Sequence, residues 1–365
     1  MNAAITLAER GLVPDRLIRA GIRHQLRRRL RAEEARTASG EGGLAPHLAA
    51  MRAGLIAVSV NDANVQHYEV PASLFEAVLG RNLKYSCAYW SGGVQSLDDA
   101  EAAMLTLTCE RAGIRNGMRV LDLGCGWGAL SLWVAERFPD SQVLAVSNSV
   151  SQCRFIEDLR NRRGLHNIEV VTADVNRFVP SGHFDRVVSV EMFEHLRNYE
   201  SILKRIASWL APGGRLFIHI FVHRQYPYFF KVGESTDWMA RHFFTGGMMP
   251  SEDLLPACDG PLAVESQWLV GGTHYAKTAR AWLTNLDHRH DRVEEVLQRD
   301  LGTADGTRWL HRWRLFFLAC AELFDYRGGR EWRVAHYRLA VRGEKPDLER
   351  ESAGVRPGVY SGRKP

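Results

Sequence analysis

The chain has 365 residues, of which 45% are hydrophobic and 24% charged, so it is long enough for one large domain or two smaller ones. The 47 Lys and Arg residues outnumber the 42 Asp and Glu residues by only 5, which excludes a composition typical of nucleic-acid binding. The 6 cysteines form no C-x-x-C pair, so we expect neither a disulfide framework nor a metal site. The sequence shows no apolar run of about 18 residues and no secretory leader, which favours a cytoplasmic protein.

The first segment, residues 1–36, is basic and has a helical pattern. Apolar residues recur every four positions within 15–35, which predicts an amphipathic helix. One interpretation is a surface helix whose apolar stripe packs on the body of the protein. The other is peripheral contact with an anionic membrane at its inner face, because basic helices attract acidic lipids. The arginines of this segment are Arg16, Arg19, Arg23, Arg27, Arg28, Arg29, Arg31 and Arg36.

Residues 37–116 are expected to form a helical region that covers the substrate and the cofactor, with helices near 45–57 and 71–80. From 117 to 340, short apolar runs alternate with helical patterns, which is typical of a parallel, doubly wound sheet. The expected strands are 118–123, 142–146, 168–171, 184–190, 215–222, 262–270 and 331–340. The expected helices are 128–138, 150–163, 198–210, one that begins near 276, and 306–326.

Two segments depart from this alternation. Residues 223–260 are aromatic and irregular, and we expect them to form a lid inserted over a site. Residues 341–365 are polar and rich in Gly and Pro, and we expect a flexible tail.

A glycine-rich loop, Asp122-Leu-Gly124-Cys-Gly126-Trp-Gly128, follows the first expected strand. Glycines at the carboxyl end of such a strand let a ligand approach the backbone closely. The spacing is not the G-x-G-x-x-G of dinucleotide sites, and no acidic residue follows the second strand. By itself, the loop is also compatible with a tight turn that binds nothing.

Three features together resemble class I methyltransferases that use S-adenosylmethionine (SAM). They are the glycine-rich loop, Asp174 at the end of the third strand and the Pro212-Gly-Gly turn before the fifth strand. Longer motifs narrow the resemblance to the superfamily of cyclopropane fatty acid synthases and coclaurine N-methyltransferases. It implies an α/β fold with a Rossmann-like, doubly wound sheet of seven mostly parallel strands, an N-terminal helical extension and an inserted lid. The motifs are Tyr85-Ser-Cys-Ala-Tyr-Trp, Glu191-Met-Phe-Glu-His-Leu-Arg-Asn-Tyr, Phe243-Phe-Thr-Gly-Gly-Met-Met-Pro-Ser and Gly272-Thr-His-Tyr-Ala-Lys-Thr.

The resemblance also implies which residues bind SAM. In the superfamily these are a Tyr-Ser pair, the glycine loop, the residues after strand two, a downstream Gln and an acidic residue after strand three. From the residues alone, Gln152 is also compatible with a solvated helix position and Tyr85 with a core aromatic. The matching positions are Tyr85, Ser86, Asp122, Gly124, Gly126, Gly128, Ser147, Asn148, Gln152, Asp174 and Val175.

Acid-base candidates follow the fourth expected strand, at the edge of the sheet where the glycine loop lies: Glu191, Glu194 and His195. An amine that accepts a methyl group must first lose its ammonium proton, so a base is needed nearby. The resemblance assigns the matching positions of the N-methyltransferases to substrate binding and deprotonation. We predict His195 as the base, Glu194 as its partner and cation stabiliser, and Glu191 nearer the cofactor. The alternative is structural, with Glu194 capping a helix and His195 satisfied in the interior.

The cyclopropane branch is the alternative function, in which SAM methylates the double bond of an unsaturated phospholipid acyl chain. Enzymes of that branch resemble one another in holding a bicarbonate ion with a Cys, a Glu, a His and a Tyr. The matching positions are Cys87, Glu194, His219 and Tyr275, although Cys87 is equally typical of a small core residue.

Two details favour the N-methyltransferase branch. Phe244-Thr-Gly-Gly stands where the cyclopropane synthases carry Phe-Pro-Gly-Gly, and Val270-Gly-Gly-Thr-His-Tyr stands where they carry an Asn-Phe-Gly pattern. Aromatic residues such as Trp238 and Phe244 also concentrate in 225–244. Such a set is suited to box a cationic substrate, although a lid packed on its own domain needs the same residues. We therefore predict in-line transfer of a methyl group from SAM to a small amine. A regulatory protein without activity would lack the acid-base residues. The sequence does not decide the oligomeric state, although a dimer is compatible with it.

Overall fold

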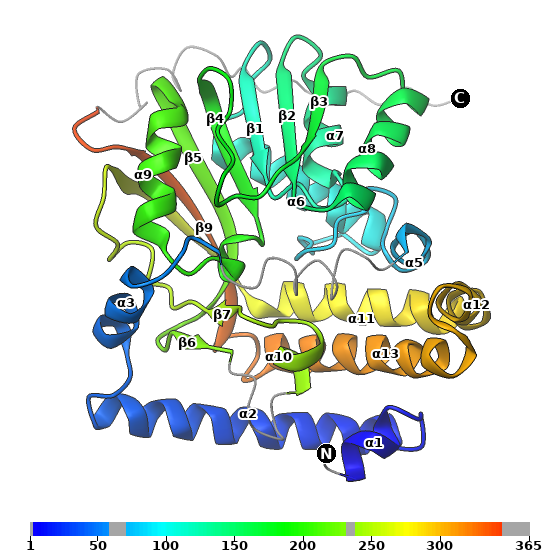
Figure 1. Cartoon of the computed structure of the whole chain (residues 1–365). Coiled ribbons are helices and arrows are strands. Elements are labelled where there is room, and N and C mark those ends of the chain that lie inside the picture. The colour runs from blue at the N-terminus through cyan, green and yellow to red at the C-terminus, as the bar shows by residue number, and fades with distance from the viewer. Residues whose placement is uncertain (1–2, 58–70, 231–237, 345–365) are drawn as a thin grey trace.

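The computed structural model describes residues 3–57, 71–230 and 238–344 (Figure 1). Its main sheet has the order β3-β2-β1-β4-β5-β9-β8, in which β1 to β5 run parallel and β9 runs antiparallel to both of its neighbours. The predicted doubly wound, mostly parallel sheet of seven strands is confirmed. The strands are β1 (Arg119–Leu123), β2 (Gln142–Ser147), β3 (Ile168–Thr172), β4 (Phe184–Val190), β5 (Leu210–His223), β8 (Leu262–Val270) and β9 (Trp332–Val341).

Helices cover both faces of this sheet. Successive strand residues point to opposite faces, so Leu121 and Val187 pack on one side while Val120 and Val188 pack on the other. The first side is covered by α3 (Leu44–Arg52) and α9 (Tyr199–Trp209), and the second by α6 (Leu97–Ala112), α7 (Ala129–Arg137) and α8 (Val150–Arg162). Each fully buried Val or Leu contributes about 1.5–3 kcal/mol to the free energy of unfolding.

A further helical layer lies below the sheet in Figure 1, next to the carboxyl ends of the parallel strands. It contains α5 (Ala72–Val78), α11 (Gly272–His288), α12 (His290–Leu301) and α13 (Thr303–Asp325), with α1 (Ala3–Ala8) and α2 (Asp15–Ala38) outside them. The apolar stripe of α2 packs on this layer, and Arg19 and Arg23 both bond to Glu322 of α13. The predicted amphipathic helix therefore exists, and its stripe is used for packing.

Some elements differ from the predictions. Helix α6 was not expected, because its buried positions include polar residues such as Glu101 and Thr108 and its apolar pattern is weak. The expected lid contains only β6 (Tyr228–Phe229), α10 (Trp238–His242) and β7 (Met248–Met249) as regular elements among its described residues. Part of the expected helical cover, 58–70, part of the lid, 231–237, and the tail from 345 to 365 lie outside the described residues. Within the described ranges, no helix is long and apolar enough to span a membrane.

Candidate active site

A cavity of about 180 Å³ lies between the carboxyl ends of the strands and the helical layer. Most of the predicted site residues line it, although they come from segments far apart in the chain. Predicted residues that do not line it are Gly128, Asp174, Cys87, His219 and Trp238. Those that do are Tyr85, Ser86, Asp122, Gly124, Gly126, Ser147, Asn148, Gln152, Val175, Glu191, Glu194, His195, Phe244 and Tyr275.

The glycine loop forms the sheet side of the cavity. The backbone N–H groups of Gly124 and Cys125 both donate to Val146 O at 2.9 Å, which ties the loop to β2. Gly124 has φ +85°, and a Cβ there would lie 2.6 Å from Met192 Cγ. Gly128 has a different role, since a Cβ there would lie 2.8 Å from Ile156 Cγ1 of α8. The third glycine thus permits close packing of the loop on a helix.

The end of β2 supplies a buried polar cluster. Ser147 Oγ donates to Gln152 Oε1 at 2.7 Å, and Gln152 is 1% exposed, so it is not a solvated helix residue. Ser149 caps α8 by accepting from the N–H of Gln152 at 3.3 Å. Asp122 accepts from Ser131 Oγ at 2.6 Å, and burial raises the pKa of Asp122 to about 6.

Asp174, one of the residues expected to bind SAM, bonds within its own turn. Its Oδ1 accepts from the N–H of Asn176 at 2.8 Å and from Asn176 Nδ2 at 3.0 Å. The neighbours Ala173 and Val175 line the cavity instead.

Glu191 directly follows β4 and is held by three donors. Its φ of +48° is rare for a residue with a side chain and is typical of strained functional positions. Glu191 Oε1 accepts from the N–H of Cys87 at 3.0 Å and from His219 Nε2 at 3.2 Å, while Oε2 accepts from Tyr275 Oη at 2.5 Å. Burial raises the pKa of Glu191, and the Lys84 ammonium is the largest opposing effect. When Glu191 is ionised, its carboxylate can accept all three bonds at once.

Lys84 is itself 2% exposed and holds the segment that contains the Tyr-Ser pair. Its Nζ donates to Ser86 Oγ and, at 2.9 Å, to Cys87 O. Lys84 was not among the residues that the resemblance implied. Nothing in the sequence around it predicts that this lysine is buried.

Glu194 and His195 line the same cavity, and burial favours the uncharged form of both side chains. Glu194 is 1% exposed, its Oε2 has no hydrogen-bond partner among the described residues, and burial raises its pKa well above the usual range. Burial lowers the pKa of His195 to about 4, so its imidazole is neutral at physiological pH. The ring stacks on Phe244, with centroids 5.7 Å apart.

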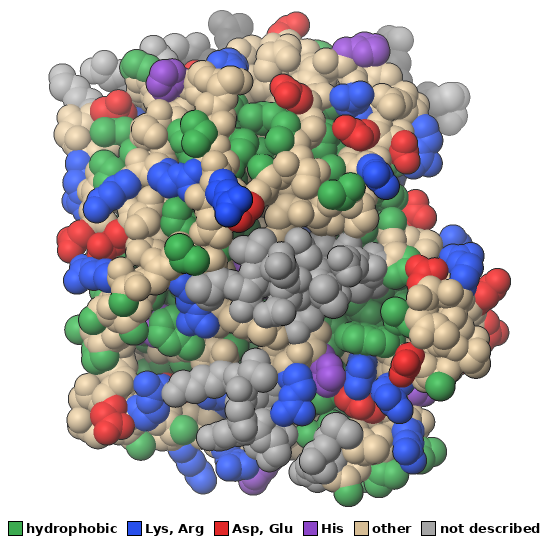
Figure 2. Space-filling model, in the orientation of Figure 1, with side chains coloured by type: hydrophobic (Ala, Val, Ile, Leu, Met, Phe, Trp, Pro, Cys, Tyr) green, Lys and Arg blue, Asp and Glu red, His purple; other side chains and the backbone are tan. Residues whose placement is uncertain are grey.

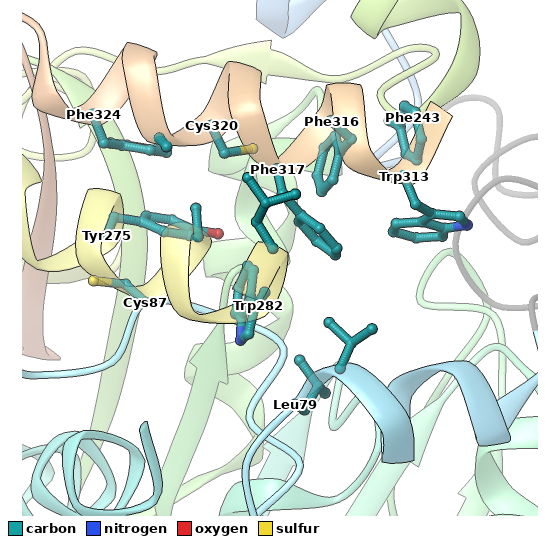
Figure 3. Close-up of a cluster of buried hydrophobic side chains, with 14 of the residues drawn as sticks. Leu79, Cys87, Phe243, Tyr275, Trp282, Trp313, Phe316, Phe317, Cys320 and Phe324 are labelled. Carbon is teal, nitrogen blue, oxygen red and sulfur yellow. The ribbon is translucent and has the colours of Figure 1, made fainter. Parts of the chain in front are cut away.

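Aromatic side chains form the helical side of the cavity. Figure 3 shows Tyr275 and Trp282 of α11 beside the aromatic residues of α13: Tyr275 stacks on Phe324 with centroids 4.1 Å apart, and the Trp282 and Phe317 centroids are 5.7 Å apart. Trp282 and Phe316 line the cavity but were not predicted, because nothing in the sequence brings two distant helices to the glycine loop. Trp127 also lines the cavity and was not predicted, although it lies within the glycine loop itself. Trp238 was predicted here, yet its Nε1 donates to Glu9 Oε1 at 2.7 Å outside the cavity.

Residues 59–330 match the family model of mycolic acid cyclopropane synthetase. The chain is 38% identical over 333 residues to (S)-coclaurine N-methyltransferase of Thalictrum flavum subsp. glaucum, which spans 90% of this chain and 92% of the relative. It is 29% identical over 283 residues to cyclopropane-fatty-acyl-phospholipid synthase of Escherichia coli strain K12, which spans 76% of this chain and 68% of the relative. The crystal structure of coclaurine N-methyltransferase bound to N-methylheliamine and SAH has a TM-score of 0.88 at 34% identity, over 92% of this chain and 98% of that chain.

Fold, site and these similarities define a SAM-dependent methyltransferase of class I. The chain belongs to the mycolic acid cyclopropane synthetase family, and its similarity to the coclaurine N-methyltransferases is higher than to the fatty-acyl synthase of Escherichia coli.

The residues around the glycine loop fit SAM. Asp122 and Trp127 both line the cavity. Asp122 Oδ1 and Trp127 Nε1 are buried and have no hydrogen-bond partner among the described residues. A Cβ on Gly126 would meet nothing within 4 Å, so the backbone there is open to a ligand.

Bicarbonate does not fit in the same way. Cys87, His219 and Tyr275, three of the four expected bicarbonate partners, already bond to the Glu191 carboxylate, and Glu194 is not part of that cluster. A carboxylate of the chain thus takes the place of an external anion.

Proposed function

We propose that this enzyme methylates the nitrogen of a small amine, with His195 as the base. The observation that carries the proposal is that the neutral imidazole of His195 and the buried carboxyl of Glu194 line one aromatic cavity, and that Glu194 Oε2 has no hydrogen-bond partner among the described residues. An imidazole already charged could not accept a proton, and burial keeps this one neutral. The observed geometry supports acid-base roles for both side chains.

When bound, SAM supplies an activated methyl group, and the chain positions the acceptor nitrogen and excludes water. We propose that SAM is held by residues that line the cavity: Tyr85, Ser86, Asp122, Gly124, Gly126, Ser147, Asn148, Gln152 and Val175. Asp174 and Gly128 support this site from outside the lining, the first through its turn and the second through its packing on α8.

The acceptor enters from the helical side in this proposal. An ammonium group between the aromatic rings is attracted to their faces, and the ionised Glu191 adds an opposite charge. A cation beside Glu194 also favours the ionised form of that carboxyl, whose burial otherwise keeps it protonated. Loss of the ammonium proton to His195 Nδ1 or Nε2 then frees the nitrogen lone pair for in-line attack.

Labelled SAM offered to a panel of cyclic and acyclic amines, and separately to anionic liposomes with unsaturated chains, tests the proposal. We expect label in an amine product. We also expect His195→Gln to lower kcat by about 10²–10⁴-fold while the Kd for SAM stays within a few-fold. His183→Gln, at an exposed histidine, is the matched control. Label in the lipid fraction, or full activity of His195→Gln, would contradict the proposal.

The alternative, methyl or methylene transfer to an unsaturated acyl chain, is favoured by the 29% identity to the synthase of Escherichia coli. The Glu191 carboxylate in the expected bicarbonate position argues against it. The liposome arm of the same assay decides between the two acceptors.

We also propose peripheral contact of α2 with anionic membranes. The side chains of Arg16, Arg27 and Arg31 are exposed and form no ion pair with the described residues. Basic side chains lie along the lower edge of Figure 2, where α2 runs. Because the apolar stripe of α2 is packed on the protein, the contact would be electrostatic and sensitive to salt. Flotation with vesicles with and without acidic lipid tests it; equal binding to both, or none, would refute it.

A further inference from the structure

A chain of three side chains, His219, His336 and Arg111, runs from Glu191 to helix α6. His219 Nε2 lies 3.2 Å from Glu191 Oε1, His336 Nε2 lies 2.9 Å from His219 Nδ1, and Arg111 Nη1 lies 2.8 Å from His336 Nδ1. Both histidines are fully buried. His219 of β5 is the register partner of His336 of β9, so their side chains stand on the same face of the sheet.

Arg111 determines the direction of every bond in this chain. A guanidinium has donors only, so His336 Nδ1 must accept and therefore carries no proton. A neutral His336 then has its proton on Nε2 and donates it to His219 Nδ1. His219 in turn carries its proton on Nε2 and donates to Glu191 Oε1. Four groups thus form one run of bonds with all donors oriented toward the carboxylate.

The surroundings keep both rings in this neutral form. Burial is the main cause that lowers the pKa of His219 and of His336, and the cations Lys84 and Arg111 lower both further. The ring of Phe217 packs on His336 with centroids 5.2 Å apart, and the Arg111 guanidinium lies 5.3 Å from the Trp268 ring. Apart from His219, the groups that face Glu191 are Lys84, Cys87, Glu194, His195 and Tyr275.

We propose that Arg111, His336 and His219 are positioning residues that orient Glu191 and hold it as an ionised carboxylate toward the cationic end of the substrate. This role rests on the proposed function, since it gives Glu191 an amine cation to face. None of the three residues lines the cavity, so each acts through the next.

The reverse arrangement shows what Arg111 prevents. Without its donor, His336 can carry its proton on Nδ1 and His219 can do the same, each ring staying neutral. His219 Nε2 then becomes an acceptor, and Glu191 must bring a proton of its own to satisfy it. The reversed chain therefore binds one more proton than the observed one, and that proton sits on Glu191.

Arg111→Met tests the proposal through its pH profile. Because the variant permits a protonated Glu191, we expect the acid limb of kcat/KM to move to higher pH, with a several-fold loss at the acid end and little loss at the alkaline end. Arg111→Lys, which also has donors only, should restore most of the profile. Arg115→Met, at an exposed arginine just beyond the end of α6, is the matched control and should leave the profile unchanged.

A second measurement needs no substrate. Two-bond ¹H–¹⁵N correlation spectra of the full chain should show both histidines protonated on Nε2, with the His336 signals assigned by their loss in His336→Gln. In Arg111→Met we expect a shift toward the Nδ1 form. Nδ1-protonated rings in the unaltered protein, or a pH profile unmoved in Arg111→Met, would overturn the proposal. If no amine is methylated but the tautomers are as expected, only the proposed function fails.

Discussion

The two sides of the cavity are built on different principles. The sheet side consists of glycines and short polar side chains that directly follow β1 and β2, within about thirty residues of one another. The helical side consists of large aromatic rings from α11, α13 and the segment after α10, including Trp282, Phe316 and Phe244. Glu191 connects the two, because it follows β4 and bonds to Tyr275 of α11.

This difference suggests that the sheet side binds the cofactor and that the helical side binds the acceptor. Glycines at a rigid strand end can be replaced by few other residues, so this side is adapted to a ligand that a whole family shares. Rings from separate helices can be exchanged without altering the sheet, so the acceptor side is where specificity can change. Substitutions on the sheet side should therefore affect SAM binding, and those on the helical side should affect the acceptor alone.

The largest effect is expected from Gly124→Ala. A Cβ there would lie 2.6 Å from Met192 Cγ and 2.9 Å from Met192 Cβ, and alanine is strained at φ +85°. We expect SAM affinity, measured by calorimetry, to fall by about tenfold or more. Gly117→Ala has a similar φ of +86° but meets nothing within 4 Å, so it should bind SAM normally. Unchanged affinity in Gly124→Ala would remove the distinction between the two sides.

Glu191→Gln and Glu194→Gln form a matched pair at the junction. In Glu191→Gln the amide NH₂ faces donors, so we expect the free energy of unfolding, measured in urea at pH 7, to drop by about 1–3 kcal/mol. Glu194 Oε2 has no hydrogen-bond partner among the described residues, so for Glu194→Gln we expect a change below about 1 kcal/mol. Equal losses in both variants would show that Glu191 does not join the two sides.

Phe244→Leu probes the helical side alone. It removes a ring that lines the cavity and stacks on His195, which we expect to weaken acceptor binding by about 1 kcal/mol, a several-fold rise in KM. The Kd for SAM serves as the internal control and should not change. A matching loss in SAM affinity would mean that the two sides are not independent.

The smallest effect concerns pH and stability. The pKa of His195 is about 4 in the folded protein against 6.5 as its ordinary value, so between these values the unfolded chain binds a proton that the folded one does not. Stability therefore falls as pH drops from 6.5 toward 4. At pH 6 His195→Gln should recover about 1 kcal/mol or less of this loss. A steeper acid loss in His195→Gln would contradict the assignment.

Local sequence patterns were enough to predict most of the sheet side. The loop from Asp122 to Gly128 and the polar residues after β2 follow strands whose apolar runs are easily read, and parallel strands end at one edge. The roles of Asp174 and Gly128 were not predictable, because they depend on which neighbour each contacts: Asn176 for the carboxylate and Ile156 for the missing Cβ.

The sequence by itself determined the fold class, the family, the position of the cofactor loop and the excess charge of +5, most of it on α2. These features depend on periodicity and on motifs a few residues long. Only the tertiary structure decided that Glu191 replaces the expected anion, that Trp282 and Phe316 line the cavity, and that Arg111 reaches Glu191 through two histidines. The contacts from Arg111 to His336 and from His336 to His219 join residues 225 and 117 positions apart. Burial, which shifts the pKa of Glu194 and His195 in opposite directions, exists only once the chain has folded.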